Sequence, residues 1–445
     1  MRNDLPDLTA LDARDRMVRG EFTALDYCEA LLKRIAEREP EVGAFAHFDA
    51  DFARTQAKAC DAHRATGRAT GPLHGLPVGV KDIVDTRDFP TENGTPIDAG
   101  RRPVEDAVVV QRLKAAGAVI MGKTVTTELG ARTPRGTRNP RHREHTPGGS
   151  SSGSAAAVGA GMVPLGIGTQ TNGSVIRPAS FCGIVGFKPS FGLIPRTGVL
   201  PQAPPLDTLG VFARSAADAG LLVDALAGHE PRDRDTRPAP PPRLLQTALT
   251  DPPVTPALAF VKTFAWEHAE AETREGFAEL VAALGETCHE VALPDTFLEG
   301  DRALVTITNV GLGRNYKPWY DRGKDQLSDF MRTMIEEGET IPAVDYLEAL
   351  DWQTALRVGI NQLFERYDAI ITPAAPGEAP QGLDSTGNSA FNNLWSLLGV
   401  PALTLPLLEG PKGLPVGVQV VGRHGDDARL LRTARWLQST LADNG

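Results

Sequence analysis

Residues 146–158, TPGGSSSGSAAAV, place two glycines and three consecutive serines directly before a run of small apolar residues. Glycine lets the backbone approach another group closely, and the start of a helix leaves free N–H donors that suit an anion or a developing oxyanion. No lysine follows Gly153, so the segment is not a phosphate-binding P-loop. A flexible Ser/Gly linker is the alternative, although linkers do not usually run straight into an Ala-rich helix. We expect a functional loop, then a helix over 154–161 and a strand over 163–167.

The pattern of an expected helix followed by a short apolar strand recurs along the chain. Further pairs are expected at 107–116 with 118–121, at 267–284 with 291–293, and at 353–367 with 369–372. Helices are also expected from Thr23 onward and over 51–65 and 428–441, with strands over 76–80 and within 402–421. This alternation predicts an α/β protein whose helices are layered around a sheet.

Length and local composition give two different indications of domain number. At one domain per 150 residues, the length of 445 alone predicts about three domains. The segment 228–256 is rich in proline and charge and predicts a surface connection, which could be a domain boundary. Against a boundary, the apolar strands within 402–421 need a sheet to join.

Composition predicts a globular protein and excludes several partners. Apolar residues make up 41% and the net charge is −10, which disfavours binding to nucleic acid or to anionic membrane surfaces. The four cysteines form no CxxC pair, and the first residues are charged where a signal peptide would be apolar. We therefore expect a protein of the reducing cytoplasm, with no disulfide framework and no membrane span.

Two further segments could carry chemistry. In 168–180, GTQTNGSVIRPAS, Ser174 follows a turn-prone run whose backbone amides could form an oxyanion hole, although a serine that merely caps a turn is the simpler interpretation. In 75–86, GLPVGVKDIVDT, Lys81 is surrounded by valines and isoleucine. Desolvation would lower the pKa of such a lysine and let a neutral amine act as a base, whereas most lysines are solvated.

Taken together, these segments closely resemble the amidase signature family. The resemblance rests on 75–86, 146–158 and 168–200, on AVVVQRLKAAGAVIMGKTVTTELG at 107–130, and on the tail FNNLWSLLGVPALTLPLLEGPKGLPVGVQVVG at 391–422. It covers most of the chain from 71 to 422, while 228–390 matches only loosely. The resemblance implies one large domain, an α/β/α sandwich around a mixed sheet. Its parts would be an N-terminal helical segment (1–70), the signature core (71–227), the connection (228–256) and a C-terminal part completing sheet and pocket (257–445).

The resemblance also implies a Ser/Ser/Lys amidohydrolase. By motif position, Ser174 would be the nucleophile, Ser150 the bridging serine after a cis peptide at Gly149, and Lys81 the base. The backbone N–H groups of Thr171, Asn172, Gly173 and Ser174 would hold the oxyanion. Cleavage of an amide would pass through an acyl-enzyme on Ser174, and no metal or organic cofactor would be required.

Two departures from the family pattern lie beside the proposed nucleophile. The family often has Asp and Gly where this chain has Gln170 and Asn172; asparagine tolerates left-handed backbone better than most residues, so we expect the turn to survive. Gly149, Gln170 and Arg177 are expected to contact substrate. Arg177 matches a position that in some members resembles a carboxylate clamp, and bracing of the loop is an equal alternative for it.

A serine esterase is a rival interpretation, because 149–153, GSSSG, fits the GxSxG pattern with Ser151 as nucleophile and His424 late in the chain. The basic, proline-containing stretch 132–148 is unlike the strand that should precede such an elbow. His142 and His145 are expected in a solvated loop rather than at a metal, and Cys182 in the core.

Partners and substrate are less well defined by the sequence. The chain could be one component of a multi-chain amidotransferase, but PPLDTLG at 204–210 lacks the serine usual before Leu-Asp in such members and favours a stand-alone amidase, with a homodimer as a further expectation. Residues 301–350, including Arg314, Asn315, Tyr316, Trp319 and Tyr320, are expected to cover the site and select the substrate. Aliphatic amides, aryl amides and urea- or biuret-like compounds all remain open.

Overall fold

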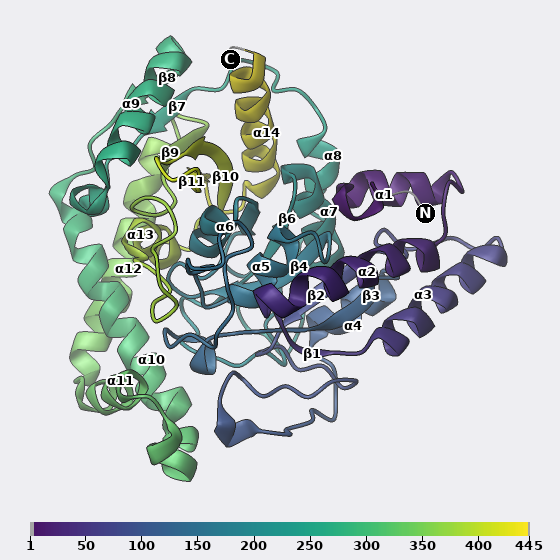
Figure 1. The fold of residues 1–445 in the computed structure, drawn as a ribbon. Coiled ribbons are helices and arrows are strands. Elements are labelled where there is room, and N and C mark those ends of the chain that lie inside the picture. Colours follow the sequence, from purple (N-terminus) through teal and green to yellow (C-terminus); the bar gives the residue numbers. More distant parts are fainter. Residues whose placement is uncertain (1–3, 444–445) are drawn as a thin grey trace.

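The computed structural model describes residues 4–443 and is built around one 11-stranded mixed sheet (Figure 1). The strand order is β1-β3-β2-β4-β6-β5-β10-β11-β9-β7-β8. Strand β2 pairs in parallel with β3 and β4, and β7 pairs in parallel with β8 and β9, whereas the other pairs are antiparallel. The strands are β1 (Phe45–Phe48), β2 (Pro77–Lys81), β3 (Val119–Thr124), β4 (Leu165–Gln170), β5 (Val185–Lys188), β6 (Thr208–Ala213), β7 (Leu258–Phe260), β8 (Cys288–Glu290), β9 (Ala369–Pro373), β10 (Ala402–Glu409) and β11 (Pro415–Val421).

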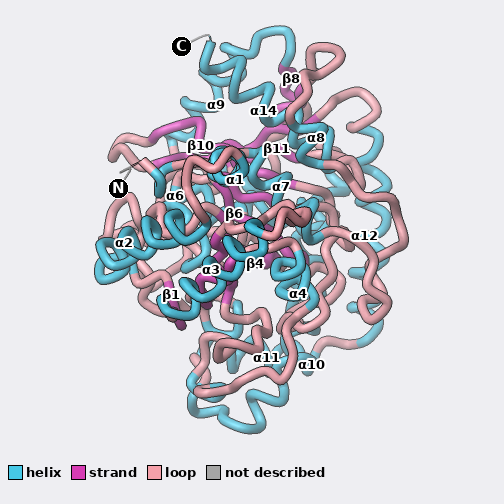
Figure 2. Tube along the Cα trace, turned by 90° about the vertical axis from the view of Figure 1, so that its right-hand side faces the viewer, coloured by secondary structure: helices cyan, strands magenta, loops and turns pink. Residues whose placement is uncertain are grey.

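Helices cover the sheet and form an additional layer beside it (Figures 1 and 2). In Figure 1, β6 is drawn between α6 on one side and α7 on the other, and α10, α11 and α12 form the lower left of the molecule. The α-helices are α1 (Ala10–Val18), α2 (Ala24–Val42), α3 (Ala50–Ala65), α4 (Val108–Ala115), α5 (Ser152–Gly159), α6 (Ile176–Cys182), α7 (Ala216–Leu226), α8 (Leu244–Ala248), α9 (Ala271–Leu284), α10 (Glu299–Gly323), α11 (Asp329–Thr340), α12 (Ala343–Leu363), α13 (Ala390–Leu397) and α14 (Asp427–Asp443). The predicted α/β class, with helices around a large mixed sheet, is confirmed.

Several strands are buried along their whole length because both faces of the sheet are covered, although β2, β3 and β5 each include a buried lysine: Lys81, Lys123 and Lys188. Every residue of β2, β3, β5, β6 and β9 is buried, and such strands show no alternation of polar and apolar side chains. The C-terminal strands enter the middle of this sheet, since β10 pairs with β5 on one side and β11 on the other. Residues about two hundred positions apart in sequence therefore share one core.

Several element boundaries differ from the sequence expectations. The helix expected over 267–284 is a 3-10 turn, Phe264–His268, followed by α9, and the strand expected at 291–293 is β8, which ends at Glu290. The helix expected to begin at residue 353 starts ten residues earlier, because the exposed first half of α12 carries apolar side chains such as Val344 and Leu347 that obscure the helical pattern. The helix after the serine run, α5, begins at Ser152 rather than at residue 154.

The segment 228–256 is more than a surface connection. It contains the short helix α8, which packs against α7 and α14 and buries Leu244 and Ala248. Asp233 lies at the start of the segment and pairs with Arg196 at 3.1 Å. No helix within residues 4–443 is long and apolar enough to cross a membrane.

Candidate active site

Lys81 is the last residue of β2, and its side chain is fully buried. The Lys81 Nζ donates to Ser150 Oγ at 2.7 Å and to Thr169 Oγ1 at 2.8 Å. Burial lowers the pKa of the Lys81 amine well below its ordinary value, and the negative charge of Asp207 opposes this shift only in part. A neutral amine in contact with a serine hydroxyl can accept its proton.

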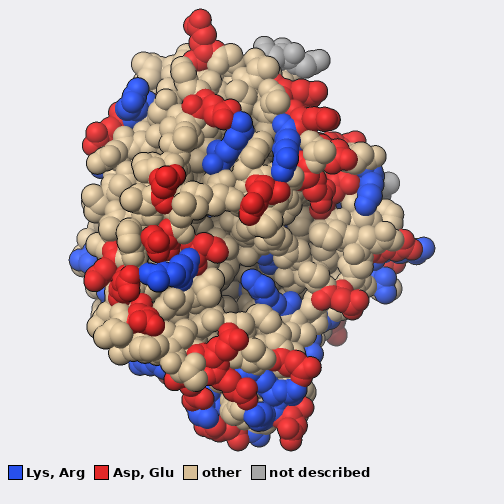
Figure 3. All heavy atoms as spheres, turned by 90° about the vertical axis from the view of Figure 1, so that its left-hand side faces the viewer, with Lys and Arg blue, Asp and Glu red and all other residues tan. Residues whose placement is uncertain are grey.

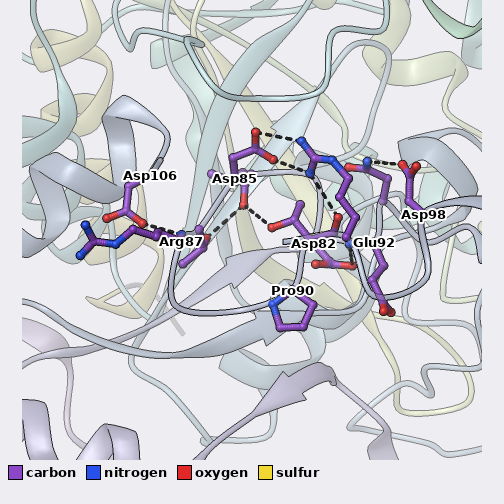
Figure 4. A network of polar contacts seen from close by, with 12 residues as sticks. Asp82, Asp85, Arg87, Pro90, Glu92, Asp98 and Asp106 are labelled. Atoms are coloured by element: carbon purple, nitrogen blue, oxygen red, sulfur yellow. Dashed lines mark hydrogen bonds and ion pairs between the residues drawn. The ribbon is translucent and has the colours of Figure 1, made fainter. Parts of the chain in front are cut away.

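A polar network holds the segment that follows Lys81 in place (Figure 4). Asp82 accepts from Lys123 Nζ at 3.0 Å and from the backbone N–H of Glu92 at 3.1 Å, and both members of the Asp82–Lys123 ion pair are buried. Asp85 forms a two-bond contact with Arg101 at 2.8 and 3.1 Å. The network fixes the end of β2 and therefore the position from which the Lys81 side chain extends.

Ser150 lies in the turn before α5. The Gly149–Ser150 peptide bond is cis, as expected from the resemblance, and the Ser150 side chain is buried. The carbonyl oxygen of Ser150 accepts from Thr127 N at 3.2 Å and from Thr126 Oγ1 at 3.2 Å. These contacts come from the segment after β3, so neighbouring parallel strands supply Lys81 and the residues that hold Ser150.

The loop 171–175 joins β4 to α6 and carries Ser174. Gln170 braces this loop, because its Oε1 accepts from the backbone N–H groups of Val175 at 2.8 Å and Ile176 at 3.0 Å. Its Nε2 donates to Ser396 Oγ at 3.0 Å, a bond that an aspartate could not make. The side chain of Gln170 is fully buried and its amide is engaged by these protein groups, so the expected contact with substrate is replaced by a structural role.

The turn itself differs from the expectation about Asn172. Within residues 4–443 the non-glycine residues with positive φ are Asn93, Leu129 and Arg243, so Asn172 does not use a left-handed conformation. The carbonyl oxygen of Asn172 accepts from Ser396 Oγ at 2.5 Å. In the described part of the chain no acceptor bonds to the backbone N–H of Asn172, Gly173 or Ser174. These donors are therefore free to bind a developing oxyanion.

A cavity of about 200 Å³ opens beside this loop. Its wall includes Thr171, Asn172, Gly173 and Ser174, and helices α10 and α11 supply a side with four apolar and two polar residues. The residues contributed by these two helices are Val305, Thr308, Asn309, Leu312, Phe330 and Met334. The expectation that 301–350 covers the site holds for this cavity, but the residues that line it are not the aromatic ones that the sequence singled out.

Those aromatic residues have structural partners instead. Tyr316 is buried and donates to the Leu129 carbonyl at 2.5 Å, and Trp319 Nε1 donates to Asp98 Oδ2 at 2.6 Å. Arg314 and Asn315 line a second cavity of about 430 Å³. The two cavities share Thr171 and Gln202 as lining residues.

Asp207 is a residue of this region that the sequence did not single out. It accepts from Thr171 Oγ1 at 2.6 Å and from the backbone N–H groups of Gln202 and Ala203, and burial raises its pKa. It belongs to PPLDTLG, a segment in which the sequence draws attention only to a missing serine. Its contact with Thr171 is formed only in the folded chain, so the sequence offered no signal for this role.

Arg177 lies in α6 and also lines the smaller cavity. Its Nη2 donates to the Gly149 carbonyl at 2.6 Å and to Thr386 Oγ1 at 3.1 Å, so it braces the turn that precedes Ser150. Burial lowers the pKa of its guanidinium to about 9. Its Nε has no hydrogen-bond partner within the described residues.

The esterase pair is not assembled in this structure. Ser151 is buried, and its Oγ donates to the Thr169 carbonyl at 3.2 Å and accepts from Thr169 N at 3.3 Å. His424 contacts the Phe191 carbonyl at 3.2 Å. No interaction within the described chain joins Ser151 to His424.

The histidine and cysteine expectations have mixed outcomes. His145 is buried with its Nδ1 2.6 Å from the Ala379 carbonyl, so the prediction of a solvated loop is wrong for it, whereas His142 is exposed. Among residues 4–443 no group of three or more His, Cys, Asp or Glu side chains could hold a metal ion. Cys182 lies in the core as predicted, and burial raises the pKa of its thiol.

Comparison with known proteins places this geometry in a family. A family model described as Amidase matches residues 26–431. The chain belongs to the amidase family. A glutamyl-tRNA(Gln) amidotransferase subunit of Chloroflexus aggregans is 34% identical, covering 96% of this chain and 95% of that protein.

Solved structures of amidase-family enzymes share the fold. One is a chain of a vestigial protein complex that was described as revealing the evolutionary origins of an s-triazine catabolic enzyme. It superposes on this protein with a TM-score of 0.91 and is 29% identical, and the match covers 97% of this chain and 98% of that chain. The native peptide amidase of Stenotrophomonas maltophilia superposes with a TM-score of 0.84 and is 28% identical, and the match covers 97% of this chain and 96% of that chain. The predicted membership and the predicted amidase signature fold are both confirmed.

Proposed function

We propose that this amidase-family protein is an amidohydrolase that cleaves a carboxamide C–N bond through an acyl-enzyme on Ser174. The observation that carries the proposal is the buried contact of 2.7 Å between Lys81 Nζ and Ser150 Oγ. It supports Lys81 as the base and Ser150 as the bridge, since a desolvated amine is neutral and can take a proton. The family resemblance assigns Ser174 as the nucleophile.

The reaction would proceed in two half-reactions. Lys81 takes the Ser150 proton as Ser150 takes that of Ser174, and Ser174 Oγ attacks the amide carbonyl. The N–H groups of residues 171–174 hold the oxyanion, and its collapse releases ammonia or an amine that receives the proton back through Ser150. Water then attacks the Ser174 ester with the same relay as base. No step requires a metal or organic cofactor, and a small-molecule amide is the expected substrate.

Ammonia or amine release from a panel of aliphatic, aryl and carbamoyl amides tests this function. Single variants Lys81→Ala, Ser150→Ala and Ser174→Ala are each expected to lower kcat/KM by about 1000-fold or more, because the relay and nucleophile act as a unit. Ser151→Ala and His424→Ala serve as the matched controls for the esterase alternative. Loss of activity in these two with full activity in Ser174→Ala would overturn the proposal.

The second candidate function is that of a hydrolase or amidotransferase component that needs a partner chain for activity. It is favoured by the 34% identity to a component of an amidotransferase and by the superposition on a chain of a vestigial protein complex. Size-exclusion chromatography coupled to the amide assay separates the two cases. A purified chain that is active alone, as a monomer or homodimer, supports the stand-alone hydrolase, whereas a chain that is inert until a second protein is added supports the partner-dependent one.

A further inference from the structure

One face of helix α13 lies against the loop 171–175 that carries Ser174. The residues of this face are the N-cap Ser389 and, within the helix, Asn392 and Ser396, and such spacing places side chains on one side of a helix. A Cβ atom built on Gly173 would lie 2.4 Å from Asn392 Oδ1 and 2.9 Å from Ser389 Cβ, so the backbone of the loop touches the helix directly. The position of α13 therefore limits where this backbone can lie.

Helix α13 is itself anchored to the rest of the protein. Asn392 is fully buried, and its Nδ2 donates to the Ala374 carbonyl, just after β9, at 2.9 Å. Asn393 Nδ2 donates to Asp301 Oδ1 of α10 at 3.1 Å. The helix is thus a fixed support for the loop.

The direction of each hydrogen bond between Gln170 and Ser396 is set by the surrounding backbone. The N–H groups of Val175 and Ile176 point at one end of the Gln170 amide, and only its oxygen can accept from them. The nitrogen end must therefore face Ser396, whose oxygen accepts from it at 3.0 Å. A serine hydroxyl has a single hydrogen, so the hydrogen of Ser396 goes to the Asn172 carbonyl at 2.5 Å.

These bonds form a continuous chain that ends at the N–H of Gly173. The Asn172 carbonyl and the Gly173 N–H belong to one planar peptide unit, so the bond from Ser396 to the carbonyl also fixes the direction in which the N–H points. The bond makes this N–H a stronger donor, because hydrogen bonds in a chain polarise one another. No acceptor within the described residues bonds to the Gly173 N–H, so the chain acts on a donor that is free to meet an oxyanion.

We propose that Ser396 is a positioning residue of the oxyanion hole: its hydroxyl orients and polarises the 172–173 peptide, and Gln170 sets the direction of that hydroxyl. The inference rests on the proposed function, because it assigns the Gly173 N–H to the oxyanion that forms when Ser174 attacks. Neither Gln170 nor Ser396 lines the cavity beside Ser174, and neither takes part in the proton relay.

Both side chains can be exchanged without changing the charged surface of the protein. Figure 3 looks onto the face that α10 and α12 form, and it shows acidic and basic side chains distributed over that surface. Gln170 is fully buried and Ser396 is 2% exposed. An effect of these exchanges on catalysis therefore arises inside the protein.

Ser396→Ala removes the donor to the Asn172 carbonyl. With the best amide of the panel, kcat is expected to fall about 10- to 100-fold at nearly constant KM, because an oxyanion-hole donor acts in the transition state. The rate at which a fluorophosphonate labels Ser174 is expected to fall by a similar factor.

Ser180→Ala is the matched control. The Ser180 hydroxyl is buried in α6 and accepts from Gly417 N at 2.8 Å, which joins it to β11 rather than to the Ser174 loop. Both serine variants are expected to lower the thermal unfolding midpoint by similar amounts, whereas Ser180→Ala keeps the wild-type kcat. A loss of kcat in Ser180→Ala as large as that in Ser396→Ala would indicate general destabilisation and overturn the inference.

Gln170→Glu separates the direction of the hydrogen bonds from the shape of the side chain. The new carboxylate still accepts from the two backbone N–H groups, but it has no hydrogen for Ser396, so the Ser396 hydroxyl turns to the carboxylate and away from the Asn172 carbonyl. The value of kcat at the upper plateau of the pH profile is expected to fall about as far as in Ser396→Ala. The double variant is expected to fall no further, because both changes remove the same bond.

The new negative charge also favours the protonated form of Lys81, so the rising limb of the pH profile of Gln170→Glu is expected to move to higher pH. Ser396→Ala introduces no charge and is expected to lower the plateau without moving the limb. Comparison at the plateau therefore separates lost positioning from the effect of charge. If Ser396→Ala does not fold, the plateau of Gln170→Glu decides the inference.

Two further outcomes overturn the inference while leaving the proposed function intact. Ser396→Ala retains kcat and the labelling rate within about twofold of the wild-type values, or the losses of the two single variants add in the double variant. If the wild-type protein neither hydrolyses an amide nor is labelled at Ser174, the proposed function fails, and crystal structures of the wild-type protein and Ser396→Ala still decide the inference. A changed orientation of the 172–173 peptide supports it, and an unchanged orientation contradicts it.

Discussion

Among single residues, the proposed chemistry depends most on Lys81, because its side chain is buried. The sequence identified Lys81, Ser150 and Ser174 because each lies in a short motif of the family, and the structure places Lys81 against Ser150. The sequence could not show the roles of Gln170 and Asp207. Their hydrogen-bond partners are distant along the chain: Ser396 is 226 residues from Gln170, and Thr171 is 36 residues from Asp207. The cis bond at Gly149 was available only through the resemblance.

The pH dependence of activity follows from the shifted pKa of Lys81. Burial favours the neutral amine, so the folded-state pKa lies well below the ordinary value of 10.5. The base works only when it is deprotonated, so kcat/KM is expected to rise with pH through the folded-state pKa and to level off before pH ~10. A steady-state profile from pH ~6 to ~10 measures this. A rising limb centred near the ordinary lysine pKa would show that Lys81 is protonated in the free enzyme at neutral pH.

At the scale of elements, the strand ends and the loops that follow them build the site. Apolar runs predicted that β2, β3 and β4 are strands, because strands covered on both faces are mostly apolar. The bounds were less accurate, since β4 is Leu165–Gln170 where 163–167 was expected, and β3 is Val119–Thr124 where 118–121 was expected. The same method misplaced β8 and the start of α12, where exposed apolar residues such as Val344 and Leu347 weaken the contrast between faces. Boundaries at the surface are set by local caps and contacts rather than by burial.

The Asp82–Lys123 ion pair joins β3 to the loop after β2, and its disruption is expected to destabilise the fold. Asp82→Asn leaves the Lys123 ammonium buried without its carboxylate, so the free energy of unfolding is expected to fall by about 3 to 5 kcal/mol. Denaturant unfolding followed by circular dichroism measures the change. The double variant Asp82→Leu/Lys123→Met removes both charges and is expected to recover most of the loss. A loss below about 1 kcal/mol in the single variant would mean that the pair is not structurally important.

At the scale of the whole molecule, one sheet joins the two ends of the chain. Length alone predicted about three domains, whereas strands between Phe45 and Val421 form a single sheet. The order of its strands could not be read from the sequence, because β10 is inserted beside β5 by contacts between residues 185–188 and 402–404. The single-domain organisation remains a prediction that rests on this pairing.

Truncation tests that prediction. A fragment of residues 1–227 lacks β10 and therefore exposes the edge of β5 together with apolar surface of α6. We expect it to aggregate or to lack a cooperative thermal transition, since an unpaired apolar strand edge promotes association. Far-ultraviolet circular dichroism during heating and analytical ultracentrifugation give the answer. A monomeric fragment that unfolds cooperatively would identify the signature core as a domain of its own.

The central claim is that Ser174 is the nucleophile and that Lys81 activates it. The most direct test is to label the protein with a fluorophosphonate probe and to locate the labelled residue by peptide-mapping mass spectrometry. The proposed chemistry predicts one label per chain on Ser174, its loss in Ser174→Ala, and a strong decrease in Lys81→Ala, because the hydroxyl reacts only when the buried amine accepts its proton. A label on Ser151 that is unaffected by Lys81→Ala would contradict the account.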